Sequence, residues 1–418
     1  MQEKLLKRSR IMYILEAAIE YFISILVAGS FLATLTKELG FSDSLTGILS
    51  SVISLGCLFQ LLSLTIRPKS AKKFVIALSI TNQLLFMFLY VIPVVNISAT
   101  FKTVLFVVFI FMAYLIYNFA HPNKINWLMS LVDDNKRGSF TANKEIVSLT
   151  SGIAFSFGMG ALIDYFSEKG QLRIAFILAV VVIFVLMVLH TITMILAVER
   201  ETPNVPQKNL IKTFSELIKN KSVISVTIVF ILYYVSTYIS LPFYGTYQIS
   251  ELGLSLTFVS AITMIGSISR VLVSKFWGKY ADNNSFAAMI EKCFIFHAIS
   301  QVCVVITVPQ TGKIMFILYY FFHGIALGGI NSALINLIFD YVPTEQRVDS
   351  LAITQAIAGF TGFITTLLIS PVVSQIQSSG NKVFGLPIFA QQFVSIIAVV
   401  ITIVAVFYIR FIFIKSKK

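Results

Sequence analysis

Long apolar runs alternate with short polar segments along almost the whole chain. Each run has about 20 residues or more, the length that crosses the hydrocarbon core of a bilayer as an α-helix. The first run is too long for a cleaved signal peptide and lacks a small-residue cleavage site. The pattern therefore predicts an all-α polytopic membrane protein with twelve transmembrane helices. Their expected positions are 11–36, 43–66, 74–95, 103–131, 140–165, 172–197, 223–248, 255–278, 285–308, 314–340, 348–375 and 387–413.

Two short sequences recur in the same order in the two halves of the chain. Glu38-Leu39-Gly40-Phe41-Ser42 returns as Glu251-Leu252-Gly253-Leu254-Ser255. Further along each half, Ile125-Asn126 returns as Ile335-Asn336. Solenoid repeats are only about 20 to 50 residues long, whereas this repeat covers about half of the chain. We expect two pseudo-symmetric six-helix bundles with the functional site between them, as in transporters built from internal repeats.

A long polar segment between the sixth and seventh apolar runs sets the predicted domain boundaries. We expect an N-terminal six-helix bundle over residues 1–198, a cytoplasmic linker over 199–222 and a C-terminal six-helix bundle over 223–418. Within the linker, residues 209–220 are amphipathic, which is typical of a segment that lies on the membrane surface.

Composition agrees with this interpretation. The chain has 57% hydrophobic and only 12% charged residues, about half the charge of a soluble domain. Most of its Lys and Arg residues lie in the segments on the same side as the N-terminus, which predicts a cell-membrane protein with both termini in the cytoplasm. This bias also accounts for the net charge of +13. We expect no nucleic-acid partner, because the positive charge is scattered over short loops.

The residues that carry enzyme or metal chemistry are sparse. Cys57, Cys293 and Cys303 lie in apolar spans without CxxC spacing, so they are expected to pack and not to bind metal. The chain has no Walker-type phosphate loop and no nucleophile–base or metal-ligand spacing. We therefore predict no cofactor, no metal site and no enzyme activity. Any transport would be driven by an ion gradient or by the gradient of the solute itself.

Three short loop segments sharpen the architecture. Gly278-Lys279-Tyr280-Ala281-Asp282 follows the eighth span, and Arg137 and Arg347 each follow a Val-containing turn after an even span. With the twelve spans and the long central loop, these segments resemble the Major Facilitator Superfamily. In the family's loop signature, arginines usually stand where this chain has Asn283 and Asn284.

The resemblance implies transport by alternating access, with these loops as conformational switches. Arg137 and Arg347 could each bond the exposed carbonyls at the end of the preceding helix, whose negative end favours a cation. Gly278 and Asp282 would belong to the same set of switch positions. The alternative is that both arginines are only cytoplasmic charges that orient the protein.

The resemblance also implies that the first and fourth spans of each half line a central cavity. Glu16 and Glu20 lie four residues apart in the first span and so share one helical face. Carboxylates inside a membrane are costly and usually face water or a cation, and two close carboxylates tend to share a proton. We expect Glu20 to couple transport to protons, with Glu16 beside it. A cation site or a structural ion pair is the alternative.

The fourth span carries polar residues around Pro122, where a helix can kink. Asn118 and His121 lie on one stripe, and Lys124 lies one turn beyond His121. We expect all three to contact the solute or the coupling ion. The alternative for Lys124 is a pair with Glu16 of the first span.

Polar and aromatic residues also lie in the corresponding spans of the second half. Tyr233 and Tyr238 belong to an aromatic seventh span, and aromatic rings stack on sugars, flat drugs and nucleoside-like ligands alike. His323 and Asn331 lie in the tenth span. These four residues complete the predicted solute site. His190 and His297 lie in peripheral spans, and we expect them to be packing residues.

Together these features predict a monomeric secondary active transporter that moves a small organic solute across the lipid bilayer by alternating access. A proton, or another cation, is the expected coupling ion. One alternative is a multidrug or lipid-like efflux transporter. The alternative from another class is a transporter-like membrane sensor without turnover.

Overall fold

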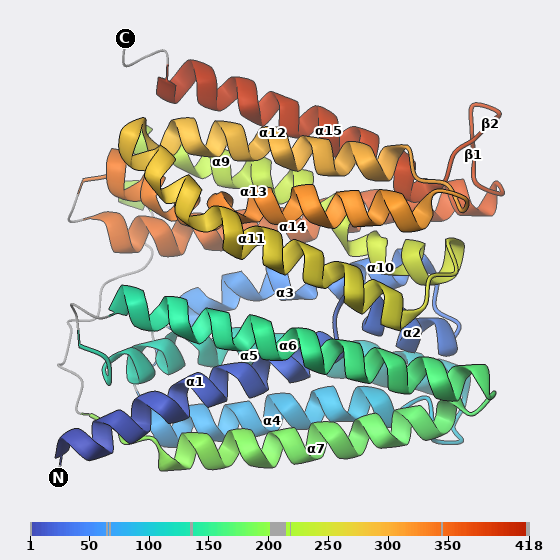
Figure 1. Ribbon diagram of the computed structural model, residues 1–418, viewed down its shortest axis with the longest axis horizontal. Helices are drawn as coiled ribbons and strands as arrows, with labels where there is room; N and C mark the ends of the chain where they lie inside the picture. Colours follow the sequence, from blue (N-terminus) through green and yellow to red (C-terminus); the bar gives the residue numbers. More distant parts are fainter. Residues whose placement is uncertain are drawn as a thin grey trace. The chain divides into compact units, whose positions relative to one another are not determined.

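The computed structural model describes residues 2–63, 66, 68–133, 137–200, 215–217, 219–343 and 346–414, apart from a few individual side chains. Nearly all of these residues are helical (Figure 1). Among them, eleven helices are long and apolar enough to cross a membrane, and a bent helix pair at the N-terminus makes the twelfth span. The predicted all-α fold with twelve spans is confirmed. Most of the predicted amphipathic segment, 209–220, lies outside the described residues.

The chain forms two compact units. The first contains the described residues of Met1–Phe41, Phe59–Gln207 and Ser255–Ser260, and the second contains those of Ser42–Leu58, Lys208–Leu254 and Ala261–Lys418. Two helices are divided between the units. The N-terminal part of α3 (Asp43–Ser63) belongs to the second unit and its C-terminal end to the first, whereas α11 (Leu256–Asn283) begins in the first unit and continues in the second.

The first unit is built from helices that run along one another (Figure 1). Besides the C-terminal end of α3 and the N-terminal turn of α11, its helices are α1 (Gln2–Leu26), α2 (Gly29–Glu38), α4 (Ala71–Val91), α5 (Ala99–Met129), α6 (Arg137–Glu168) and α7 (Leu172–Leu196).

The first span is broken in the middle. α1 and α2 meet at an angle of 40°, and Gly29 has a φ of +51°, which favours glycine because other residues clash there. The break leaves two main-chain carbonyl groups inside the unit without a partner in the helix. The side chains of Tyr90 and Tyr114 donate hydrogen bonds to the freed carbonyls of Leu26 and Val27, so these groups stay paired.

At the end of the unit that holds the N-terminus, basic side chains bind exposed helix carbonyls. Arg10 Nε donates to the carbonyl oxygen of Leu131 at 2.9 Å, just after α5, and Lys72 Nζ donates to that of Ala197 at 2.7 Å, just after α7. Cations at these positions also favour the negative end of a helix. A buried apolar cluster that includes Tyr13, Trp127 and Leu128 packs beside these contacts.

The second unit contains a second broken span. It begins as α9 (Lys221–Tyr238) and continues through the short turns η2 (Leu241–Phe243), α10 (Tyr244–Thr246) and η3 (Tyr247–Glu251). Pro242 lies in the first of these turns, where it cannot donate a main-chain hydrogen bond. The remaining elements are α12 (Phe286–Val305), α13 (Gly312–Tyr341), α14 (Arg347–Ser378), β1 (Lys382–Val383), β2 (Leu386–Pro387), α15 (Ala390–Ile409) and η5 (Arg410–Ile414).

Close helix packing in this unit depends on glycine. A Cβ atom added to Gly324 of α13 would lie 2.2 Å from the carbonyl oxygen of Gly266 on α11, so no larger residue fits there. The two strands β1 and β2 form an antiparallel hairpin, with Lys382 opposite Pro387. Its turn residues Phe384 and Gly385 both have positive φ values, as a type I′ turn requires.

Candidate functional site

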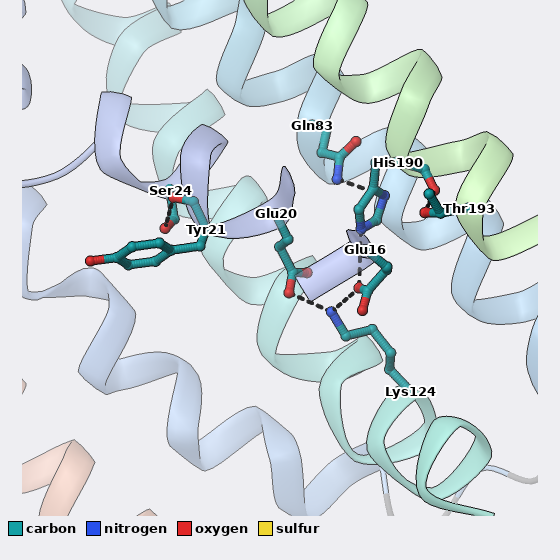
Figure 2. Close-up of polar contacts among 8 residues, drawn as sticks. All are labelled: Glu16, Glu20, Tyr21, Ser24, Gln83, Lys124, His190 and Thr193. Atoms are coloured by element: carbon teal, nitrogen blue, oxygen red, sulfur yellow. Dashed lines mark hydrogen bonds and ion pairs between the residues drawn. The ribbon is translucent and has the colours of Figure 1, made fainter. Parts of the chain in front are cut away.

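A buried cluster of charged side chains lies inside the first unit. Glu16 and Glu20 lie one turn apart on α1, and both carboxylates face Lys124 of α5 (Figure 2). Lys124 Nζ donates to Glu16 Oε1 at 2.7 Å and also binds Glu20 Oε2. The side chains of Glu16 and Lys124 are 1% and 5% exposed, whereas that of Glu20 is 20% exposed. The pair of Glu16 with Lys124, weighed above as an alternative, is therefore present.

Two further side chains complete the cluster. His190 of α7 places Nε2 3.1 Å from Glu16 Oε1, and Gln83 of α4 places its amide nitrogen 3.0 Å from His190 Nδ1 (Figure 2). An amide nitrogen only donates, so Nδ1 accepts and the ring proton is on Nε2, directed at Glu16.

The charges of the cluster do not balance. Two carboxylates, those of Glu16 and Glu20, face one ammonium group, that of Lys124. Buried charge is costly unless it is paired and hydrogen-bonded. Glu16 Oε2 is buried and has no hydrogen-bond partner among the described residues. The site therefore has room, in electrostatic terms, for one more positive charge.

Glu20 is the member of the cluster that solvent can reach. It lines a small pocket with Lys124 and His121, whose volume of about 10 Å³ is close to what a single water molecule needs. Tyr117 and Asn82 contribute further polar groups to the walls. His121 Nδ1 is buried without a partner among the described residues. The pocket thus presents hydrogen-bonding groups beside the one accessible carboxylate.

Asn118 lies on the same helix but is already engaged. Its amide nitrogen donates to the carbonyl oxygen of Tyr114 at 2.9 Å, and its amide oxygen accepts from Gln60 of α3 at 2.9 Å. With 2% of its surface exposed, it joins α5 to α3.

The predicted site residues of the second unit lie mostly in an aromatic cluster. Tyr233 stacks on Phe294 with ring centroids 5.8 Å apart, and Tyr238 stacks on Tyr234 at 5.7 Å. His323 stacks on Tyr319 at 5.2 Å and lies beside His297. Asn331, by contrast, has an exposed side chain.

The predicted switch positions have different surroundings. Arg347 Nε donates to the carbonyl oxygen of Val342 at 3.1 Å, the contact with the preceding helix end that we expected. The side chain of Arg137 lies outside those that the structure describes. The segment from Gly278 to Asp282, expected to be a loop, is wrongly placed by the sequence analysis, because α11 continues through Asn283. Apolar periodicity near a helix end does not define its last turns.

Sequence reasoning missed His190 and Gln83. Both lie in apolar helices, and His190 was expected to be a packing residue. It is fully buried, yet it binds a carboxylate and not only apolar neighbours. The one available signal was that polar side chains inside a membrane are costly and usually functional.

The fold defines a class of protein: a polytopic helical membrane protein. The sequence model of the Major Facilitator Superfamily matches residues 14–366. The chain belongs to this family.

Solved structures of transporters share its fold. The nucleoside transporter NupG matches with a TM-score of 0.70 and 14% identity, covering 98% of this chain and 99% of that chain. A bacterial homologue of the iron transporter ferroportin matches with a TM-score of 0.69 and 13% identity, over 97% and 99% of the two chains. The POT family transporter PepTSo matches with a TM-score of 0.68 and 12% identity, over 96% and 98% of the two chains. A search of curated proteins finds no match.

Proposed function

We propose that this chain is a secondary active transporter of a small organic solute, driven by protons that bind the Glu16–Glu20–Lys124 cluster. The observation that carries the proposal is the placement of one ammonium group between two carboxylates, only one of which reaches a pocket. Family membership supports transport as the activity.

Glu20 is the proposed proton acceptor. A proton on its carboxylate neutralises the excess negative charge and removes one of the two anions that hold Lys124. Lys124 then keeps its contact with the more deeply buried Glu16 and can turn its remaining donors toward the pocket. Loss of the proton restores the three-group ion pair. Coupling would follow if the proton binds one conformation of the transporter more tightly than the other, because a ligand shifts an equilibrium between two states only through its different affinity for each.

Opened wider than in this conformation, the pocket would favour a polar organic solute. Its walls offer the imidazole of His121, the phenol of Tyr117 and the amide of Asn82, which bind hydroxyl, amide and carboxylate groups. The solved neighbours are described as a nucleoside transporter, a homologue of an iron transporter and a POT family transporter. Their diversity argues that the family fold alone does not select the solute.

Outside the pocket, Arg347 is a proposed switch residue, and Arg137 is its counterpart in the first half. The contact between Arg347 and the Val342 carbonyl holds the end of α13 against the start of α14. Breaking it would alter the balance between two conformations. In this scheme the proton and the solute bind in the first unit, and the contact of Arg347 affects which of the two conformations is favoured.

A metal cation is the second candidate solute. Glu16, Glu20 and His190 bring potential ligand atoms within 4.8 Å of one another, and carboxylate with imidazole suits several divalent metals. Lys124 already binds both carboxylates, so a metal would have to displace its ammonium group. This requirement makes the organic solute the better candidate.

Uptake into proteoliposomes, with and without an imposed pH gradient, tests the proposal. Purified protein would be offered nucleosides, peptides, sugars and organic acids, and Mn²⁺ and Fe²⁺ would test the second candidate. We expect an organic solute to accumulate only when the pH gradient is present. Uptake of a metal alone would establish the second candidate instead.

The Glu20→Gln variant isolates the coupling step. Glutamine keeps the shape of the side chain but cannot exchange a proton, so solute should still equilibrate across the membrane without accumulating against its gradient. Glu3→Gln, an exposed change on the same helix, is the matched control and should behave as the native chain. Accumulation by Glu20→Gln equal to that of the native protein would rule out Glu20 as the coupling residue.

A further inference from the structure

A second pair of carboxylates lies at one end of the second unit. Asp43 is the first residue of α3, and Glu251 is the last residue of η3. Gln377 lies one residue before the end of α14, and Gln391 is the second residue of α15. Four segments that are far apart in the sequence therefore meet at this end, each with a polar side chain.

Amide groups bridge the two carboxylates. Gln377 Nε2 donates to Asp43 Oδ2 at 2.7 Å and to Glu251 Oε1 at 3.1 Å, so one nitrogen joins both acids. Gln391 Nε2 donates to the same Asp43 oxygen at 3.0 Å. Asn381 Nδ2 approaches Glu251 Oε2 at 3.4 Å. The two carboxylates and three amides thus form one connected cluster.

No side chain in the described part of the chain supplies a cation to this cluster. Among the described residues, neither Asp43 nor Glu251 forms an ion pair. Both side chains are half-buried, and two close carboxylates repel each other most strongly where water is partly excluded. Amide donors solvate the acids but do not neutralise them.

Unused oxygen atoms lie in the same cluster. Gln391 is 0% exposed, and its amide oxygen has no hydrogen-bond partner among the described residues, although its nitrogen binds Asp43. The amide oxygen of Asn381 is also buried and without a described partner. A half-turn of either side-chain amide exchanges its nitrogen and oxygen, which would bring a carbonyl oxygen to the carboxylates.

We infer that this cluster binds a hard divalent cation of the Ca²⁺ class. Two carboxylates neutralise its charge, and amide carbonyls and waters complete the oxygen shell that Ca²⁺ takes. The five side chains offer no sulfur or imidazole, which softer metals favour. Mg²⁺ requires a near-ideal octahedron and gives up its water reluctantly, so a mixed shell of flexible amides suits it less well.

The site distinguishes the two copies of the repeated Glu-Leu-Gly-x-Ser sequence. Glu251 opens the second copy of the Glu-Leu-Gly-x-Ser sequence, and Glu38 opens the first. Glu38 is exposed, whereas Glu251 joins a bridged pair. A bound cation would hold the starts of α3 and α15 to the ends of η3 and α14. This role is independent of the proposed transport function.

Equilibrium dialysis with radioactive calcium tests the inference on detergent-solubilised, metal-free protein. The native chain should bind one Ca²⁺, in the weak range of about 10⁻⁴ to 10⁻³ M that open, extracellular-type sites show. Excess NaCl should not displace it, and MgCl₂ should compete at least tenfold more weakly. Asp43→Asn and Glu251→Gln should each reduce the affinity at least tenfold.

The repeat supplies the control variant. Glu38→Gln should bind calcium as the native chain does, and Gln391→Leu, which keeps both acids, should weaken binding several-fold. Monodisperse elution of each variant in gel filtration separates loss of the site from loss of the fold. Absence of saturable calcium binding, or equal binding by native protein and Asp43→Asn, would overturn the inference. Saturation by Na⁺ alone, or a proton-dependent change without metal, would overturn it as well.

Discussion

The two carboxylate pairs of this protein are neutralised in different ways. Glu16 and Glu20 face an ammonium group that the chain itself provides, Lys124 (Figure 2). Asp43 and Glu251 face only amides from described residues. Because Glu16 and Glu20, the inner pair, share a cation that belongs to the chain, one added proton would change which carboxylate Lys124 binds. Asp43 and Glu251, the outer pair, have no such cation among the described residues, so an ion from solution would be needed to neutralise them.

The comparison predicts its largest effect at Lys124. Lys124→Met would leave the buried carboxylate of Glu16 and the partly exposed one of Glu20 without their cation, and breaking a buried ion pair costs about 3–5 kcal/mol. We expect a markedly lower thermal unfolding midpoint in detergent and no solute transport. Adding Glu16→Gln and Glu20→Gln should recover most of the stability, because no buried charge remains, but not the transport. A stable, active Lys124→Met single variant would show that the cluster is not an ion pair of consequence.

The outer pair can be given the same internal cation. Gln377→Lys would place an ammonium group where one amide nitrogen now binds both Asp43 and Glu251. We expect calcium binding to be lost and the free energy of unfolding in chelator to rise by about 1 kcal/mol, because the ammonium group would pair with partly exposed acids. Gln377→Met, of similar length but without charge, is the control. If the lysine variant still binds calcium with native affinity, the ion does not lie between these two acids.

Removal of one acid should have opposite signs in the two pairs. Glu16→Gln takes away a partner of Lys124 and of His190, so it should lower stability by about 1–3 kcal/mol. Asp43→Asn relieves a repulsion and should raise stability in chelator by about 0.5–1 kcal/mol. Thermal unfolding of both variants in chelator measures the two signs. The same sign for both would contradict the distinction between the pairs.

Hydropathy predicts the fold well because each transmembrane helix corresponds to one continuous run of apolar residues in the sequence. The pairing of Glu16 with Lys124 was also within reach, since helical spacing puts Glu16 and Glu20 on one face and charges in a membrane need partners. His190 was not, because its contact depends on how α7 packs against α1. The outer cluster combines Asp43, Gln377 and Gln391 from three separate helices, and ordinary amides at helix ends carry no sequence signal.

The smallest effect is predicted at Glu38, and it decides what the repeat means. Glu38 and Glu251 begin the same short sequence, but only Glu251 shares a donor with a second carboxylate. Glu38→Gln should leave calcium affinity, unfolding midpoint and solute uptake unchanged within error, because a single exposed charge is well solvated. Measured beside Glu251→Gln, it separates the turn that both copies share from the ion site that only one copy has. A calcium defect in Glu38→Gln equal to that in Glu251→Gln would mean that the repeated sequence, and not the bridged pair, creates the site.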